Sequence, residues 1–239
     1  MTNNESMTKP FRVSIEGNVG SGKSTLMNYF SHFPQVDARP EPIEEWRSVQ
    51  GHNLLMLTYE NPQQWNFPFQ HYVQLSRLNL QTKPSSKPVQ IIERSLQNNR
   101  FCFVEMAHSS GLLSDPNYIA LCEWYDWIEK HIDIELDLIV YLRSTPKVVY
   151  ERMQKRNRPE EKNVPLEYLT KIHQAYEKWL LGQNPEYLPA PVFVLNVDKE
   201  LKAVNLMYKI VEQYIFGQKL LPMKGYVGEF EVNKIDCSC

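Results

Sequence analysis

Apolar and polar positions along the chain follow two alternating patterns. Short apolar runs that end in polar residues predict buried strands, and they lie at 11–15, 36–39, 89–92, 137–142 and 192–197. Longer stretches with apolar residues three or four positions apart predict helices, which cover 26–33, 62–82, 96–109, 116–131, 146–156, 165–182 and 201–216. This alternation of strand and helix predicts an α/β fold, in which helices cover both faces of a five-stranded parallel sheet.

The two ends of the chain lack this alternation. Residues 1–10 are short and polar, and the helical periodicity stops after Gly217. Residues 218–239 contain one β-like run, at 226–232, and we expect them to form a tail of uncertain order rather than a second domain. A chain of 239 residues can build one domain with a full core, and we expect that domain to cover 11–217.

Composition limits the partners and the location of the protein. Charged residues make up 23% of the chain and the net charge is −2, which gives no reason to expect a nucleic-acid or membrane partner. The N-terminus lacks the apolar core of a signal peptide and the Arg-rich character of a transit peptide. We therefore expect a cytoplasmic protein, or a mitochondrial one if a leader has been removed. Cys102, Cys122, Cys237 and Cys239 are expected to be reduced thiols, with metal binding or oxidation as the alternative for the last two.

The stretch after the first predicted strand has the spacing of a phosphate-binding loop, with two glycines separated by four residues and then Lys and Ser. Its residues are Gly17, Asn18, Val19, Gly20, Ser21, Gly22, Lys23, Ser24 and Thr25. Between a strand and a helix N-terminus, such a loop places backbone N–H groups around an anion. Lys23 would reach the outer phosphates, and the Ser24 hydroxyl would hold Mg²⁺. The alternative is a glycine turn that only joins strand to helix, but turn chemistry alone needs neither Lys23 nor Ser24.

Three charged residues follow the ends of predicted strands, where ligands bind in parallel sheets. Glu41 stands between Pro40 and Pro42, which fix its approach and deny it helix geometry. A Pro-rich surface turn is the alternative. Glu93 and Arg94 follow the third apolar run, where a structural ion pair is the alternative. Beside a phosphate loop, Glu93 would face Mg²⁺, and Arg94 would steer the acceptor and the transferring phosphoryl group.

The densest basic run of the chain extends from Arg152 to Arg158, at the end of a predicted helix and before Pro159. One interpretation is a solvated helix face. Beside a phosphate site, the run instead predicts a mobile lid over about 152–163. Such a lid would close over the phosphates, exclude water and supply an arginine to the transition state.

Taken together, these residues resemble the deoxyribonucleoside kinase family, and within it the branch of the mitochondrial thymidine kinases and insect multisubstrate deoxynucleoside kinases. The resemblance covers about 11–217. The stretches that carry it are GNVGSGKST, EPIEEWRSVQGHNLL, FQHYVQLSR, IIERSLQNNRFCFVE, EWYDWIEKHI, DLIVYLRSTP and RMQKRNRPEEKNVPLEYL. It implies a P-loop kinase fold with an Arg-rich lid. It also implies that the protein transfers the γ-phosphate of ATP, with Mg²⁺, to the 5′-hydroxyl of many deoxyribonucleosides in nucleotide salvage.

The resemblance implies roles for single residues on the phosphate side. Glu41 would take the 5′-hydroxyl proton, with Arg94 beside it, and Ser24 and Glu93 would hold Mg²⁺. The loop from Gly17 to Thr25 would bind ATP. The basic residues implied for the phosphates are Lys23, Arg152, Arg156 and Arg158.

On the nucleoside side, Gln70 would pair with the base edge, because an amide offers one donor and one acceptor in a plane. The resemblance places Trp46, Phe69 and Phe103 around the base, Val73 in the same pocket, and Tyr59 and Glu161 at the 3′-hydroxyl. Stacking on flat rings tolerates many bases, which suits a broad specificity. Without the other motifs, aromatic residues at such positions would more often belong to the core.

One position departs from the thymidine kinase branch. That branch usually carries Met where this chain has Arg77. An arginine there resembles the deoxycytidine and deoxyguanosine kinases, which pair it with an Asp, but the matching position here is Asn99. We expect Arg77 to crowd a thymine methyl, to offer a donor to a cytosine or purine edge, and to be less firmly held without the Asp. A surface-pointing Arg77 is the alternative.

Other functions make different demands on the sequence. A nucleoside monophosphate kinase would need basic groups for the acceptor phosphate, whereas Gln70, Tyr59 and the aromatic residues suit an uncharged nucleoside. A GTP-dependent switch is suggested by the N-K-x-D string at 233–236, but that string lies near the chain end and no D-x-x-G motif occurs. A catalytically silent relative would not need Lys23, Glu41 and Arg94 together.

The resemblance also implies a homodimer formed through helices. The stretch at 121–132, with Trp124, Tyr125 and Trp127, would supply an apolar interface. The alternative is that these rings belong to the core.

Overall fold

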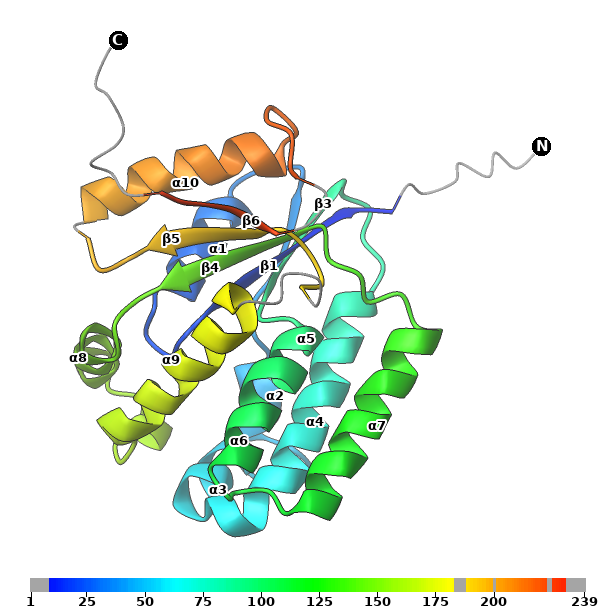
Figure 1. Cartoon of the computed structure of the whole chain (residues 1–239), viewed down its shortest axis with the longest axis vertical. Coiled ribbons are helices and arrows are strands. Elements are labelled where there is room, and N and C mark those ends of the chain that lie inside the picture. Colours follow the sequence, from blue (N-terminus) through cyan, green and yellow to red (C-terminus); the bar gives the residue numbers. More distant parts are fainter. Residues whose placement is uncertain (1–8, 183–187, 200, 223–224, 231–239) are drawn as a thin grey trace.

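Six parallel strands form the central sheet of the protein (Figure 1). The structure is a computed structural model that describes residues 9–182, 188–199, 201–222 and 225–230. The order across the sheet is β2-β3-β1-β4-β5-β6. The strands are β1 Phe11–Gly17, β2 Val36–Arg39, β3 Val89–Glu93, β4 Leu138–Arg143, β5 Val192–Asn196 and β6 Tyr226–Phe230. The five predicted strands are confirmed, and they are parallel as predicted.

The sixth strand comes from the segment expected to be a tail. β6 pairs with β5, so the β-like run predicted at 226–232 contributes to the sheet. Helix α10 (Leu201–Ile215) connects the two strands. The string at 233–236, Cys237 and Cys239 lie outside the described residues. Cys102 and Cys122 are not bridged, as expected.

Successive residues of β4 show that both faces of the sheet are buried. Leu138, Val140 and Leu142 belong to a core shared with α1 (Lys23–Ser31) and α10. Ile139 and Tyr141 belong to a second core, on the other face, shared with α8 (Pro146–Arg156) and α9 (Leu166–Leu181). A strand that is apolar at every position is typical of a parallel sheet with helices on both faces.

Three further helices stand beside one another and extend away from the sheet (Figure 1). They are α4 (Pro62–Thr82), α6 (Glu105–Ser109) and α7 (Asp115–His131). The helix predicted at 96–109 exists, but its middle is not α-helical. A short α5 (Leu96–Asn98) leads into a π-helical segment, η1 (Asn99–Val104), and then into α6. Such π-helical insertions are often found at functional sites, and η1 carries two of the predicted nucleoside-binding residues, Asn99 and Phe103.

Three short elements were not predicted: α2 (Ile43–Arg47), α3 (Leu54–Glu60) and the 3₁₀ turn η2 (Pro159–Glu161). They are too short to show a helical period in the sequence. A capping signal was available for α3, because the side chain of Asn53 accepts a hydrogen bond from the backbone N–H of Met56. No described helix is both long and apolar enough to cross a lipid bilayer.

Candidate active site

A cleft of about 1140 Å³ opens at the carboxyl ends of β1 and β3. The phosphate-loop segment and α1 line one side, residues of α2, α3 and α4 line another, and α8 and η2 close it. Every site residue predicted from the sequence lines this cleft except Gly17, Asn18 and Asn99. The sequence therefore predicted correctly which distant segments form the cleft. The three exceptions form hydrogen bonds with lining residues: Gly17 with Arg94, Asn18 with Lys23, and Asn99 with Gln70.

The glycine-rich stretch is a backbone cradle at the end of β1. Gly20 and Gly22 have φ angles of +80° and +95°, a left-handed region that favours glycine. A Cβ atom at Gly20 would lie 2.8 Å from the carbonyl oxygen of Val149, so the loop and α8 could not approach as they do. Asn18 fastens the loop to α9, because its side-chain amide donates to the carbonyl oxygen of Leu169 at 2.8 Å. The cradle is therefore preformed for an anion.

Lys23 is buried at the start of α1, and its Nζ donates to the carbonyl oxygen of Asn18 at 2.8 Å. Burial lowers the pKa of Lys23 to about 7, and the nearby charge of Arg94 acts in the same direction. Glu93 and Glu41 oppose this shift. Lys23 therefore sits poised for a negatively charged ligand that would restore its positive charge.

Glu41 lies between two guanidinium groups. Arg77 Nη2 donates to one carboxylate oxygen at 2.6 Å, and Arg94 Nη1 donates to the other at 2.8 Å. Burial by itself would raise the pKa of Glu41, but the charges of Arg94 and Arg77 outweigh it and lower the pKa to about 2. Lys23 contributes to this lowering. The expected proximity of Glu41 and the phosphate loop is therefore present in the structure.

Arg94 has a left-handed backbone, with φ +61°, which is uncommon outside glycine. Its backbone N–H donates to the carbonyl oxygen of Ile15 at 3.0 Å, and its Nη2 donates to the carbonyl oxygen of Gly17 at 3.1 Å. β1 therefore holds Arg94 by both its main chain and its side chain. The guanidinium of Arg94 therefore connects the end of β1, through Gly17, to the carboxylate of Glu41.

Ser24 and Glu93 offer oxygen donors at the mouth of the cradle. The Ser24 hydroxyl lies 3.2 and 3.3 Å from the two carboxylate oxygens of Glu93. Hard oxygen ligands of this kind suit Mg²⁺, which commonly takes one or two protein ligands and completes its shell with substrate phosphates and water. The residues present fit the metal that the sequence predicts.

Arg77 is buried, with 3% of its side chain exposed, so the surface-pointing alternative is wrong. It does not pair with Asn99, and the expectation that it would be loosely held is also wrong. In addition to Glu41, Arg77 Nη1 donates to Asn98 Oδ1 at 2.9 Å and to the carbonyl oxygen of Ser95 at 3.2 Å. Asn99 instead donates to Gln70 Oε1 at 2.7 Å and so orients the amide that would read the base.

Aromatic rings surround this end of the cleft. Trp46 and Phe69 meet edge to face, with centroids 5.6 Å apart. The guanidinium carbon of Arg77 lies 5.7 Å from the ring centre of Trp46 and 5.8 Å from that of Phe103. Trp46 and Phe69 also form a small core with Val73. The rings therefore pack as core residues and line the cleft at the same time.

The predicted lid arginines are bound to the predicted sugar-binding carboxylate. Arg156 Nη2 lies 2.7 and 2.8 Å from the two oxygens of Glu161, and Arg158 Nη1 lies 3.5 Å from one of them. Tyr59 lines the same cleft and its ring packs edge to face on Tyr168. Tyr59 and Glu161 share the cleft, as expected.

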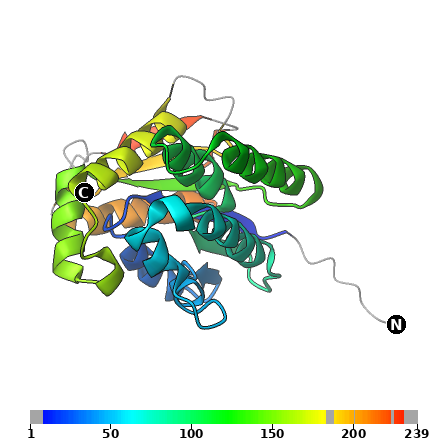
Figure 2. The ribbon, with the colours of Figure 1, turned by 90° about the horizontal axis from the view of Figure 1, so that it is seen from below.

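Sequence reasoning missed an ion pair that joins the segment predicted as a lid to the predicted nucleoside side of the cleft. Arg47, on α2, contacts Glu160, on η2, through two hydrogen bonds of 2.8 and 3.0 Å. Only 6% of the Glu160 side chain is exposed. α8, which leads into η2, lies at one edge of the molecule (Figure 2). The sequence shows both charges, but nothing in it indicates that residues more than one hundred positions apart are partners.

A preformed anion cradle, a buried lysine, two oxygen donors suited to Mg²⁺ and an ionised carboxylate all face one cleft. This combination defines a phosphotransferase of the P-loop kinase class, in which positioning and charge neutralisation carry most of the catalysis.

Comparison with known proteins defines the family. A deoxynucleoside kinase family model matches residues 13–215. The chain is 41% identical over 197 residues to mitochondrial thymidine kinase 2 of Homo sapiens, covering 82% of this chain and 74% of that protein. It is 34% identical to deoxycytidine kinase 2 of Gallus gallus (87% and 88% covered) and 35% identical to deoxycytidine kinase of Bos taurus (82% and 86%). The chain belongs to the deoxynucleoside kinase family and is an ATP-dependent kinase of nucleosides.

Because the pKa of Lys23 is lowered, we expect ATP binding to depend on pH. Because phosphates would raise a pKa that is about 7 in the free enzyme, binding should take up close to one proton at about pH 8 and almost none at about pH 6. ATP affinity should fall as the pH rises above 7. Calorimetry of ATP binding in buffers of different ionisation enthalpy measures this uptake. An absence of proton uptake at pH 8 would contradict the lowered pKa.

Proposed function

We propose that this kinase transfers the γ-phosphoryl group of ATP to the 5′-hydroxyl of a broad range of deoxyribonucleosides, with Glu41 as the group that receives the hydroxyl proton. The proposal rests on one observation above all: an ionised carboxylate lies between the phosphate cradle and the aromatic end of the cleft. A hydroxyl placed against this carboxylate would point toward the γ-phosphate.

The acidity of Glu41 suits this reaction. A carboxylate with a pKa of about 2 is a weak base. In a loose transition state the acceptor oxygen forms little bond to phosphorus before the leaving group departs, so its proton is needed only late. Glu41 would first orient the 5′-hydroxyl. It would accept the hydroxyl proton late, when the forming bond to phosphorus makes that oxygen less basic. Arg94 and Lys23 would neutralise the charge that spreads over the transferring group.

The lid and the metal-site residues would complete the phosphate side. Arg156 and Arg158 would exchange part of their contact with Glu161 for the phosphates when ATP is present, and Arg152 would contact the donor nucleotide. Ser24 and Glu93 would hold Mg²⁺, which neutralises phosphate charge when bound. The residues of the chain thus bind, orient and shield the reacting groups.

Binding of an uncharged nucleoside is supported by the pairing of charges in the cleft. A nucleoside monophosphate acceptor would require a cation available for its phosphate. Arg77, on the acceptor side, is already paired with Glu41. Gln70, held by Asn99, would read the base, and Tyr59 and Glu161 would bind the 3′-hydroxyl.

The experiment that tests the chemistry is Glu41→Gln, which keeps the shape of the side chain and removes its charge. We expect kcat to fall by about 10²- to 10⁴-fold, while the nucleoside still binds. Glu60→Gln is the matched control, because Glu60 is an exposed carboxylate at the end of α3 that does not line the cleft. Steady-state kinetics and calorimetric binding of the nucleoside measure the two effects. Full turnover by Glu41→Gln would rule out the proposed role.

Arg77 should set the preference among bases, because its Nε has no partner among the described residues and the side chain lines the cleft. Arg77→Met should move the ratio of kcat/KM for thymidine over deoxycytidine by about 10- to 100-fold toward thymidine. The ratio is informative even though kcat should fall for all substrates, since Glu41 loses one of its two guanidinium partners.

The measurement compares the four natural deoxynucleosides with ATP in wild type, Arg77→Met and Arg100→Met. Arg100 provides the control because it pairs with Glu105 and does not line the cleft. An unchanged substrate ranking in Arg77→Met would show that Arg77 does not contact the base.

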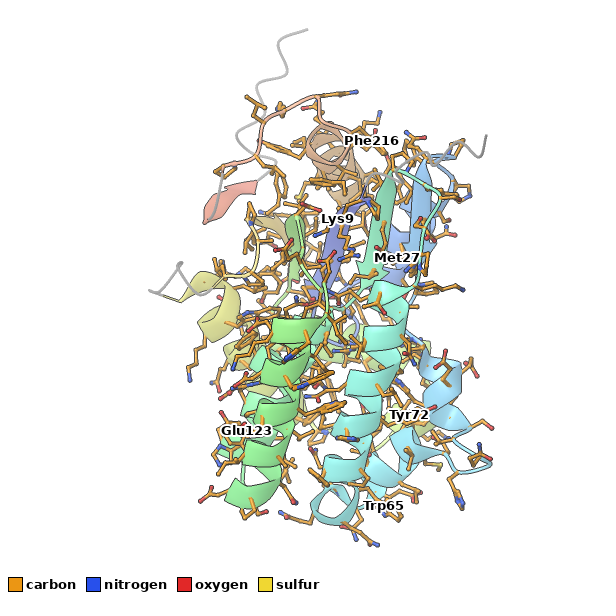
Figure 3. All side chains as sticks on the ribbon, turned by 90° about the vertical axis from the view of Figure 1, so that its right-hand side faces the viewer. Lys9, Met27, Trp65, Tyr72, Glu123 and Phe216 are labelled. Atoms are coloured by element: carbon orange, nitrogen blue, oxygen red, sulfur yellow. The ribbon has the colours of Figure 1, made fainter. Side chains whose placement is uncertain are left out.

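We also propose a homodimer formed through α4 and α7, which lie side by side (Figure 3). Trp124 and Trp127 are 39% and 47% exposed and stack with centroids 5.5 Å apart, and His71 and His131 extend the stack at either end. Tyr125, by contrast, belongs to the core. An exposed aromatic surface of this kind is typical of an interaction site.

Trp127→Glu should convert the dimer to a monomer, because a charge would be buried in an apolar interface. Leu220→Glu, at a residue 95% exposed on the α10–β6 connection, is the control. Light scattering after size exclusion gives the mass. A monomeric wild type, or a dimer that survives Trp127→Glu, would exclude this interface.

The location of the protein remains a prediction. Cytoplasm is the expectation from the sequence, and one relative is a mitochondrial protein by name. Fractionation of cells, followed by detection of this chain, would decide between the two.

A further inference from the structure

A closed network of buried polar groups lies behind the active site, and its centre is Glu16. Glu16 is the penultimate residue of β1 and is fully buried. Its Oε1 accepts hydrogen bonds from the Ser14 hydroxyl, from the Ser95 backbone N–H at 2.9 Å and from the Ser95 hydroxyl at 2.8 Å. Its Oε2 lies 3.3 Å from the hydroxyl of Tyr176. None of the catalytic roles proposed for this enzyme involves the carboxylate of Glu16.

The hydroxyl of Tyr176, on α9, connects this carboxylate to the site. It lies 2.9 Å from Asn98 Nδ2 and 3.3 Å from Arg94 Nε. Both of these nitrogens are donors, so the tyrosine oxygen must accept from them, and its single proton must go to Glu16. Glu16 thus accepts a hydrogen bond from Tyr176 and three more from Ser14 and Ser95. Hydrogen bonds donated to a carboxylate favour its ionised form. Burial raises the pKa of Glu16, and the hydrogen bonds from Ser14 and Ser95 oppose that rise.

The network reaches both guanidinium groups that hold Glu41. Tyr176 contacts Arg94 directly, and Asn98, which donates to Tyr176, accepts from Arg77 at 2.9 Å. Two buried guanidinium groups against the single carboxylate of Glu41 leave an excess of positive charge. An ionised Glu16 would balance this charge from the far side of the pair. Burial raises the pKa of Glu16 above its usual value, and the charge of Arg77 opposes that rise by favouring the ionised form.

We propose that Tyr176 and Glu16 are positioning residues for phosphoryl transfer. They hold the Nε side of the Arg94 guanidinium, so that its Nη1 stays directed at Glu41. The inference rests on the proposed role of Glu41. Arg94 Nε is held by Tyr176 and Nη2 by Gly17, which leaves Nη1 directed at Glu41. The backbone of Arg94 is left-handed, and such a strained conformation persists only where the surrounding contacts fix the residue.

A neighbouring tyrosine supplies the matched control. Tyr141, on β4, is as buried as Tyr176, and the two rings stack with centroids 5.4 Å apart. The hydroxyl of Tyr141 donates to Glu177 at 2.9 Å instead of to the network. Tyr176→Phe and Tyr141→Phe therefore each remove one buried hydroxyl and keep the ring, but only the first releases Arg94.

The test compares steady-state kinetics of these two variants with a deoxynucleoside and ATP. In Tyr176→Phe we expect kcat to fall about 10- to 100-fold, as for loss of one hydrogen bond to a charged group, with the KM of each substrate changed by less than about twofold. Tyr141→Phe should keep kcat within about twofold of wild type. Thermal unfolding of both variants separates a loss of stability from a loss of positioning. An unchanged kcat in Tyr176→Phe, or a loss confined to KM, would overturn the inference.

A second variant tests whether Glu16 acts through Tyr176. Glu16→Gln should lower kcat to a similar extent, and the double variant should be no slower than the slower single variant, because both changes break the same connection. Losses that multiply in the double variant would overturn the inference. Failure of the proposed function is distinct from failure of this inference. An active Glu41→Gln enzyme would refute the former, whereas an inactive Glu41→Gln enzyme together with a fully active Tyr176→Phe enzyme would refute only the latter.

Discussion

The geometry of the active site depends on one buried carboxylate held between two guanidinium groups. Burial alone raises the pKa of Glu41 and so favours the neutral form of its carboxyl group. Arg77 and Arg94 reverse that effect and keep it charged where a neutral hydroxyl would bind. Burying three charges carries a desolvation penalty that ion pairing rarely exceeds, so such a cluster is weak as a stabilising device. Its value lies in fixing the direction of one carboxylate relative to the phosphate cradle.

The parallel sheet explains how these charges come together. The phosphate loop follows β1, Glu93 ends β3, and Glu41 comes two residues after β2 ends. Since all of these strands run in the same direction, their carboxyl ends share one edge of the sheet. The helices then complete the cleft from the outside, and α4 carries Arg77 and Gln70 to the acceptor side. The order of strands, rather than contacts along the chain, brings the proposed donor and acceptor sites into one cleft.

The sequence was informative where a residue's position follows from its place at a strand end. Lys23 and Glu41 were predicted to meet for that reason, and they line the same cleft. The sequence was less informative where a side chain could pair with any of several residues of similar chemistry. Arg77 was expected to lack a firm partner because Asn99 replaces an Asp, yet Glu41, a charged group from another segment, holds it. The β-like run at 226–232 was predicted, but not that it joins the sheet as β6. The ion pair between Arg47 and Glu160 was not predicted either, since pairing between distant segments leaves no periodic signal.

The most direct test of this account is a structure of the enzyme with a deoxynucleoside and a non-hydrolysable ATP analogue bound together. We expect the 5′-oxygen to lie within hydrogen-bonding distance of a Glu41 carboxylate oxygen and to face the γ-phosphate in line with its leaving group. A 5′-oxygen that points away from Glu41, with the carboxylate still clamped by both arginines, would contradict the account.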